Sequence, residues 1–310
     1  MSPTPTLYAV RHSNSAGQLA VEPVWEQAGG GPLAPGYTQL VPLVVGGTLH
    51  LVAVDGAGRA SAFEVRPSAG GFTPVDSQLV LGGPWDLIQP LVIGNVPHLL
   101  AYARAGQFSF YPITADLRST TPFTYARAHA PGLTSGFDVA QPVVVGGAVY
   151  YLCYGFDSGR VLIYSLSVTA EASGDAPALA SAPVWEHQWA PRWTRFAFFR
   201  LGGGVFFLKT NVGRLNVNID HIRDDPARGT LEVGTHLDLE NALKLDIVRA
   251  LFLDRSEPYF LTYMKDGTTT FNRIHADCAG WTTEARTASV TDATQIVALQ
   301  HADGCYVLVY

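Results

Sequence analysis

The sequence carries little positive charge. Lysine occurs at only three of 310 positions, and 26 acidic residues outnumber 20 lysines and arginines, which leaves a net charge of −6. Proteins that bind nucleic acid neutralise backbone phosphates with a basic face, and anionic membrane surfaces attract basic segments in the same way. We therefore expect no nucleic-acid partner and no attachment to an anionic membrane surface.

Cysteine is also scarce. The three cysteines, Cys153, Cys278 and Cys305, are odd in number and far apart. A disulfide framework needs paired cysteines, and a zinc site needs closely spaced Cys or His residues. We expect these thiols to be small apolar core residues, and we expect neither a metal nor a cofactor.

Long apolar runs and basic leader segments are missing as well. No run approaches the roughly 18 apolar residues that a membrane-spanning helix needs. No basic segment followed by an apolar one occurs near Met1. The sequence thus predicts no membrane insertion and no secretory signal, and we expect a cytoplasmic protein.

The short motifs of several enzyme classes are absent from the sequence. It contains no GxSxG, HExxH, Walker-type or DxDxDG pattern. These patterns position a nucleophile, a zinc ion, a nucleotide phosphate or a calcium ion. None of these four kinds of site is predicted.

What the sequence does contain is a repeated phrase. Its clearest copies are "QLVPLVVGG", "LIQPLVIGN" and "VAQPVVVGG", and three weaker copies follow them. A period of this length is typical of stacked β-sheet blades. Equivalent positions, 47 to 56 residues apart, are Val41, Gln89, Gln141, Ala197, Arg249 and Ile296.

Each copy continues in the same order. A glycine turn leads to an aromatic-rich run, as in "HLLAY" from His98 and "YYLCY" from Tyr150. A second tight turn, an alternating third run and a more polar fourth run complete the unit. Glycine supplies the positive φ that hairpin turns need, and alternation indicates a half-buried strand. Each unit is therefore expected to be a four-stranded antiparallel sheet.

These units predict an all-β fold, a single six-bladed β-propeller of four-stranded antiparallel blades. The last unit stops at Tyr310 after two strands, and the segment from Leu7 resembles the missing third and fourth strands. We expect strands from both termini to complete this last blade, because closing the ring removes exposed sheet edges. The expected blades are residues 37–84, 85–136, 137–192, 193–244, 245–289, and 290–310 together with 1–36.

The stretch "EPYFLTYMKDGTTTFNRIHADCAGWT", residues 257–282, resembles the blade repeats of bacterial and fungal β-propellers. It shares with them a Pro-aromatic run, a glycine turn, an Asn-Arg-Ile run and a tryptophan. The resemblance is one of architecture and extends over the whole chain. Similar propellers include sugar-binding lectins and also enzymes, so the resemblance implies the fold and leaves the function open.

Three columns of residues are expected close to the propeller axis. Four units place an aromatic residue before the first strand, and three place Asp there; polar residues lie in some first strands, and tyrosines end several second strands. A structural role is the alternative, in which Asp caps turns and aromatic rings pack between blades. The predicted ligand-binding residues are Tyr37, Trp85, Asp86, Gln89, Tyr102, Phe137, Asp138, Gln141, Tyr154, Trp193, Asp246, Arg249 and Tyr263.

Apolar walls with a few convergent polar groups are typical of small-molecule sites. The favoured function is carbohydrate binding by a lectin-like propeller with a small-molecule or glycan ligand. The alternative is a metal-free cyclase, isomerase or lyase, with Asp86 or Asp138 as acid or base and Arg249 stabilising an anion. Divergence between the units favours this alternative, because one asymmetric axial site needs a different group from each blade. The oligomeric state is left open.

Overall fold

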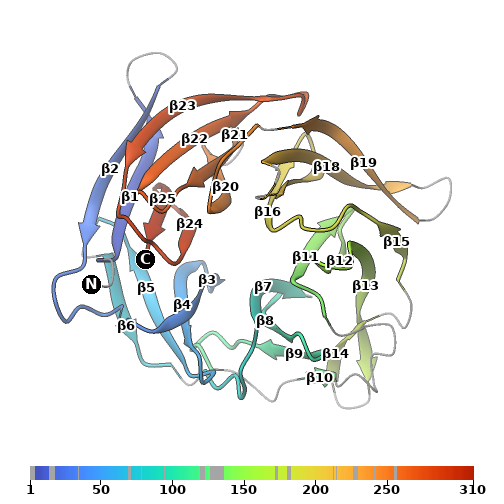
Figure 1. Cartoon of the computed structure of the whole chain (residues 1–310). Coiled ribbons are helices and arrows are strands. Elements are labelled where there is room, and N and C mark those ends of the chain that lie inside the picture. Colours follow the sequence, from blue (N-terminus) through green and yellow to red (C-terminus); the bar gives the residue numbers. More distant parts are fainter. Residues whose placement is uncertain are drawn as a thin grey trace.

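The computed structural model arranges the strands of the chain in a ring around a central axis (Figure 1). It describes residues 4–13, 18–33, 35–68, 71–77, 79–93, 95–118, 123–125, 136–171, 174–179, 183–211, 213, 215–225, 230–240, 242–254 and 257–310. In these parts of the chain the strands form six antiparallel sheets, the blades of a propeller. The predicted all-β, six-bladed fold is confirmed. The same residues form no helix, and hence none long and apolar enough to cross a membrane.

The first three blades follow one another in the chain, and each runs from an innermost strand at the axis to an outer edge. The first blade contains β3 (Tyr37–Val45), β4 (Thr48–Asp55), β5 (Ala60–Arg66) and β6 (Gly71–Val75). The second contains β7 (Leu87–Ile93), β8 (Val96–Ala103), β9 (Gln107–Pro112) and β10 (Phe123–Tyr125). The third contains β11 (Val139–Val145), β12 (Ala148–Tyr154), β13 (Arg160–Glu171), β14 (Gly174–Leu179) and β15 (Trp185–Gln188).

The remaining three blades complete the ring. The fourth contains β16 (Arg195–Leu201), β17 (Gly204–Asn211), β18 (Asn216–Asp225) and β19 (Thr230–Leu239). The fifth contains β20 (Ile247–Leu253), β21 (Glu257–Tyr263), β22 (Thr268–Ile274) and β23 (Trp281–Ala288). The sixth contains β24 (Ile296–His301), β25 (Gly304–Val309), β1 (Thr6–His12) and β2 (Leu19–Glu26).

The sixth blade joins the two ends of the chain, as the sequence predicts. Strand β1 pairs antiparallel with β25, so that Thr6 lies opposite Val309 and Val10 lies opposite Cys305. Both marked chain ends accordingly lie on the same side of the ring (Figure 1). This pairing fills what would otherwise be two open sheet edges, at β25 and β1.

Two details differ from the sequence-based expectation. In the third blade, β14 and β15 both pair with β13, because that strand is 12 residues long and offers room for two short partners in succession. In the sixth blade, Val297 rather than Ile296 is equivalent to Gln89. Val297 lies opposite Leu308 in the same way that Gln89 lies opposite Leu100.

The hairpins between the first and second strands of the first, third and fourth blades use paired glycines. Gly46 and Gly47 have φ values of 57° and 82°, and Gly146 and Gly147 have 56° and 84°. Both angles lie in the left-handed region, which a two-residue hairpin of this kind requires at both central positions and which glycine adopts without a Cβ clash. In these three blades the paired glycines thus turn the chain back from the axis.

The hydrophobic core lies between neighbouring blades. Each sheet buries both faces, and Trp85, Leu99 and Tyr111 fill the space between the first and second blades together with aliphatic residues of β3 and β4. All three cysteines are buried, as expected, and burial raises the pKa of each thiol. A single blade has no partner for these faces, so the ring is the smallest arrangement that buries all of them.

Candidate functional site

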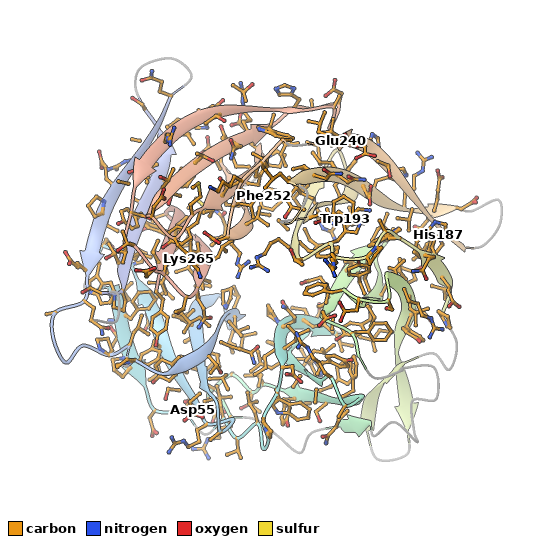
Figure 2. The ribbon with its side chains drawn as sticks, viewed as in Figure 1. Asp55, His187, Trp193, Glu240, Phe252 and Lys265 are labelled. Atoms are coloured by element: carbon orange, nitrogen blue, oxygen red, sulfur yellow. The ribbon has the colours of Figure 1, made fainter. Side chains whose placement is uncertain are left out.

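The innermost strands β3, β7, β11, β16, β20 and β24 enclose a cavity of about 440 Å³ on the propeller axis. Each of them is an edge strand, because no further strand pairs with its axial side. Proline lacks a backbone N–H and is tolerated on such an edge. Pro42, Pro90 and Pro142 occupy matching positions in β3, β7 and β11 and line the cavity. Figure 2 shows the side chains gathered around the axis.

Two glutamines connect neighbouring inner strands. The Nε2 of Gln39 donates to the carbonyl of Trp85 at 2.8 Å, and its Oε1 accepts the N–H of Ile88 at 2.7 Å. Gln295 makes the same pair of bonds from the sixth blade to the first, at 3.1 and 2.9 Å. These amides satisfy backbone groups that an edge strand would otherwise leave open.

Two arginines make similar connections on the other side of the ring. The Nε of Arg195 donates to the carbonyl of Asp246 in the turn before β20, and the Nε of Arg249 donates to the carbonyl of Ile296 in β24 at 2.8 Å. Each Nη1 donates to the carbonyl of the preceding residue, at 2.9 and 2.8 Å. Burial lowers the pKa of Arg249, and the nearby charge of Arg195 lowers it further.

The inner strands of the second and third blades differ from this pattern. Gln89 and Gln141 line the cavity, but neither reaches the next blade. The Nε2 of Gln141 donates only to the adjacent Pro142 carbonyl, at 3.2 Å. The amide of Gln89 has no hydrogen-bond partner among the described residues. Both amides are half-buried and are therefore available to a bound molecule.

Aromatic rings form part of the cavity wall. Phe156 lies in the turn after β12, and Phe196 and Phe198 lie on β16. The rings of Phe196 and Phe198 are nearly parallel, with centroids 6.4 Å apart, and Phe198 stacks on Phe207 at 5.3 Å. The cavity thus combines apolar ring faces with amide and guanidinium donors.

Asp138 is the only carboxylate among the described residues that line the cavity. Its Oδ2 accepts the N–H of Phe156 at 2.7 Å, and its Oδ1 lies 3.1 Å from the Nη2 of Arg104. Both oxygens are therefore engaged. Across the described parts of the chain, no group of three or more His, Cys, Asp or Glu residues is placed to hold a metal ion.

Four of the residues predicted from sequence meet in this cavity: Gln89, Asp138, Gln141 and Arg249. The other predicted residues lie outside it. Trp85, Phe137 and Trp193 are buried between blades, with 9%, 2% and 6% of their surface exposed. The Nε1 of Trp85 donates to the carbonyl of Leu81 at 2.7 Å, which leaves the indole no free polar group. Trp193, labelled in Figure 2, lies two residues before the inner strand of the fourth blade.

The predicted tyrosines connect one blade to the next. Tyr102, Tyr154 and Tyr263 are fully buried. Each hydroxyl accepts the backbone N–H of the residue in the aromatic column of the following blade, at 3.1, 3.3 and 2.7 Å. Burial raises the pKa of all three hydroxyls, to about 12 for Tyr102. The geometry therefore gives these residues a structural role.

Asp86 and Asp246 cap turns on the same face of the propeller. Each Oδ2 accepts the backbone N–H of the residue two positions after the column tyrosine, Arg104 at 2.7 Å and Lys265 at 2.8 Å. Neither aspartate lines the axial cavity. Tyr37 lies elsewhere, in a second cavity of about 610 Å³ that it shares with Tyr310 and Gln27 where the sixth blade meets the first.

Sequence reasoning missed three residues that bond one inner segment to the next, Gln39, Arg195 and Gln295. Each lies two positions before a residue of the column that contains Gln89, on the same face of its strand. Strand alternation gives residues i and i+2 the same orientation, so this second column could have been found from the first. The charge of Arg195 next to an aromatic run was the available signal.

No family model matches the chain, and no curated protein matches it. Solved structures share its fold. The Aleuria aurantia lectin, in complex with Fucα1-6GlcNAc, has a TM-score of 0.56 and 9% identity over 87% of this chain and 86% of that chain. AofleA from Arthrobotrys oligospora has a TM-score of 0.53 and 11% identity over 88% and 78%. The periplasmic gluconolactonase of Pseudomonas aeruginosa has a TM-score of 0.50 and 15% identity over 99% and 88%. At such identities the likeness concerns the fold alone.

Proposed function

We propose that the protein is a lectin-like propeller that binds a carbohydrate in its axial cavity. The observation that carries this proposal is the combination of aromatic ring faces with an amide, that of Gln89, that bonds no described residue. A sugar presents an apolar face of C–H groups and a rim of hydroxyls. Phe196 and Phe198 suit the face, and Gln89 and Gln141 suit the hydroxyls.

The cavity volume agrees with this ligand class. About 440 Å³ lies within the range of small-molecule sites and accommodates a mono- or disaccharide. The Aleuria lectin structure, which contains Fucα1-6GlcNAc, demonstrates that propellers of this general shape bind sugars. The blades of the present chain differ in their inner residues, so we propose one asymmetric site and not six similar ones.

The alternative of a metal-free cyclase, isomerase or lyase has less support. Acid–base catalysis needs a carboxyl group within hydrogen-bond reach of the substrate. Asp138 uses both oxygens to hold a backbone N–H and Arg104, and Asp86 caps a turn outside the cavity. The cytoplasmic location stays a prediction from the sequence.

The test combines a glycan array with titration calorimetry of monosaccharides on the wild type and a Gln89→Ala/Gln141→Ala variant. We expect the wild type to bind at least one sugar and the double variant to bind it about tenfold or more weakly, because two hydrogen-bonding amides are lost. Gln107→Ala, at an exposed position of β9, is the matched control and should bind normally. Absence of any sugar binding by the wild type, or equal binding by the double variant, would refute the proposal.

A further inference from the structure

We propose that the ligand of the axial cavity carries an anionic group, a carboxylate or a phosphate, which Arg195 and Arg249 bind together. This inference rests on the proposed carbohydrate site and defines its ligand class further, as an acidic or phosphorylated sugar. The two guanidinium groups come from the adjacent fourth and fifth blades and line one side of the cavity.

The first observation concerns unused donors. Each guanidinium donates through Nε and Nη1 to backbone carbonyls. The Nη2 of each has no acceptor among the described residues. A planar guanidinium offers five N–H donors and matches the oxygens of carboxylate or phosphate in a bidentate manner. Two such groups that line one cavity can therefore bind a single oxyanion together.

The second observation concerns charge. Neither Arg195 nor Arg249 forms an ion pair with a carboxylate within the described parts of the chain. Asp138, the one carboxylate among the described residues of the cavity wall, pairs with Arg104. Half-buried charges without a counter-ion are costly, and two of the same sign repel each other. An anionic ligand would relieve both penalties at once, and a neutral sugar would relieve neither.

The third observation comes from the internal repeat. At the position of Arg195 the first and sixth blades carry Gln39 and Gln295, and at that of Arg249 the second and third carry Gln89 and Gln141. Gln39 and Gln295 reach the backbone of the next blade as the arginines do. The fold therefore accepts glutamine in both columns and has no need of a charge there.

The cavity consequently has two chemically different sides. The guanidinium side, on the fourth and fifth blades, suits the anionic group. The amide side, on the second and third blades, suits neutral hydroxyls through Gln89 and Gln141. A molecule with an acidic end and a hydroxylated body would use both sides. This arrangement also explains why the inner strands carry different residues although the blades share one architecture.

The experiment is calorimetric titration of the full chain with four probes: glucose, gluconate, glucose 6-phosphate and inorganic phosphate. We expect at least one of the two acidic sugars to bind about tenfold or more tightly than glucose, since a charge-assisted bidentate contact exceeds a neutral one by this much. The carboxylate and phosphate arms identify which anion the site prefers. Inorganic phosphate tests the arginine pair without any contribution from a sugar.

The variants are Arg195→Gln and Arg249→Gln, singly and combined, because these substitutions introduce the residue that other blades already carry. They should remove the preference for the acidic sugars and the binding of inorganic phosphate. Arg200→Gln is the matched control: its guanidinium also donates to a backbone carbonyl of the neighbouring blade, that of Val144, but outside the cavity. Thermal unfolding of each variant verifies that it is folded, and Arg195→Lys/Arg249→Lys provides a second pair that keeps the charges.

The outcomes separate this inference from the proposed function. If glucose or another neutral sugar binds as tightly as the acidic ones, the anion inference fails and the carbohydrate site stands. If inorganic phosphate binds the wild type but not the double glutamine variant, and no sugar binds, the anion inference stands and the carbohydrate proposal fails. Unchanged anion binding by the folded double glutamine variant, or no anion binding by the wild type, overturns the inference.

Discussion

The hydroxyl of Tyr263 accepts the backbone N–H of Ala293 at 2.7 Å and donates to the carbonyl of Val290 at 3.0 Å. Tyr263 ends the second strand of the fifth blade, and Ala293 lies just before the first strand of the sixth. The Tyr263 hydroxyl thus forms hydrogen bonds with two backbone groups of the segment that connects the fifth and sixth blades. The hydroxyls of Tyr102 and Tyr154 likewise accept a backbone N–H at the start of the following blade.

Tyr263→Phe should destabilise the fold and leave ligand binding intact. The change removes the partner of a buried N–H, and an unsatisfied buried donor costs about 1–3 kcal/mol. Urea unfolding followed by tryptophan fluorescence measures the loss. Tyr37→Phe is the control, because the Tyr37 hydroxyl bonds none of the described residues and should change stability little. Equal stability of the two variants would contradict a connecting role for Tyr263.

Gln39 and Gln89 are glutamines in the inner strands of neighbouring blades. Substitution by alanine should affect stability at the first and ligand affinity at the second. Gln39→Ala removes two bonds to the second blade, each worth about 0.5–1.5 kcal/mol, and should lower the free energy of unfolding. Gln89→Ala removes no bond to a described residue, so its stability should match the wild type while its ligand affinity falls. The pair is compared by thermal unfolding and by calorimetry in parallel. A stable Gln39→Ala protein together with a destabilised Gln89→Ala protein would reverse the assignment.

Lys209 and Asp220 form an ion pair deep between the third and fourth blades. The two residues are 3% and 1% exposed, and the Lys209 Nζ lies 3.9 Å from the ring centroid of Trp189. Burial lowers the pKa of Lys209, and the charge of Asp220 offsets part of this effect. The Oδ1 of Asp220 has no hydrogen-bond partner among the described residues, so the pair is not fully satisfied by them.

Substituting one partner of this pair should lower the free energy of unfolding more than substituting both partners. Lys209→Met leaves a buried carboxylate alone and should destabilise the protein by about 3–5 kcal/mol, whereas Lys209→Met/Asp220→Leu should recover most of that loss. Urea unfolding of both single variants and the double variant gives the coupling between the two residues. A Lys209→Met variant as stable as the wild type would show that the pair contributes nothing.

Stability should fall as the pH drops below about 6.5. Burial lowers the pKa of His50, His98 and His221 from the ordinary value of 6.5. In the window just below 6.5 the unfolded chain binds protons that the folded chain does not, so the free energy of unfolding decreases as the pH falls. Thermal unfolding at a series of pH values measures this slope.

A substitution at two of these histidines should flatten that slope. Other blades carry tyrosine or phenylalanine where the first and second carry His50 and His98, so His50→Tyr/His98→Phe keeps the packing and removes two titrating groups. His187→Asn, at an exposed position labelled in Figure 2, is the control. Identical pH profiles for the double variant and the wild type would mean that other groups cause the acid sensitivity.

The fold could be predicted because its signals are local and repeated. Glycine pairs such as Gly46–Gly47 mark hairpins, and alternation in runs such as "QFSFYPI" predicts strands. That run also predicts a half-buried strand, but β9 buries both faces from Phe108 to Tyr111 because blades pack on either side of it. Where the repeat is weak the prediction slipped by one residue, to Ile296 instead of Val297. The extra strand of the third blade follows from the length of β13, and no local sequence pattern predicts that length.

The site could be predicted only in part, because one residue type serves two purposes. Asp138 and Asp86 stand in the same column, yet only Asp138 lines the cavity. Trp85 precedes an inner strand, and the chain there crosses from one blade to the next, so its ring packs between blades instead of facing the axis. Trp85→Ala would therefore test the fold and not the ligand site. Arg195 was not predicted as a site residue because the sequence of its strand, β16, departs most from the repeated phrase.

The pairing of β1 with β25 has a consequence for the order of folding. Strand β1 is synthesised long before β25, the strand that joins it to the rest of the sixth blade. Closing the long loop between them costs about 3 kcal/mol more chain entropy than closing a short hairpin. The five other blades can form from neighbouring strands as they emerge, so the ring is sealed in a late, non-local step. Until then, the unfinished ends present open sheet edges to other molecules, and this interval is when the chain is most exposed to aggregation.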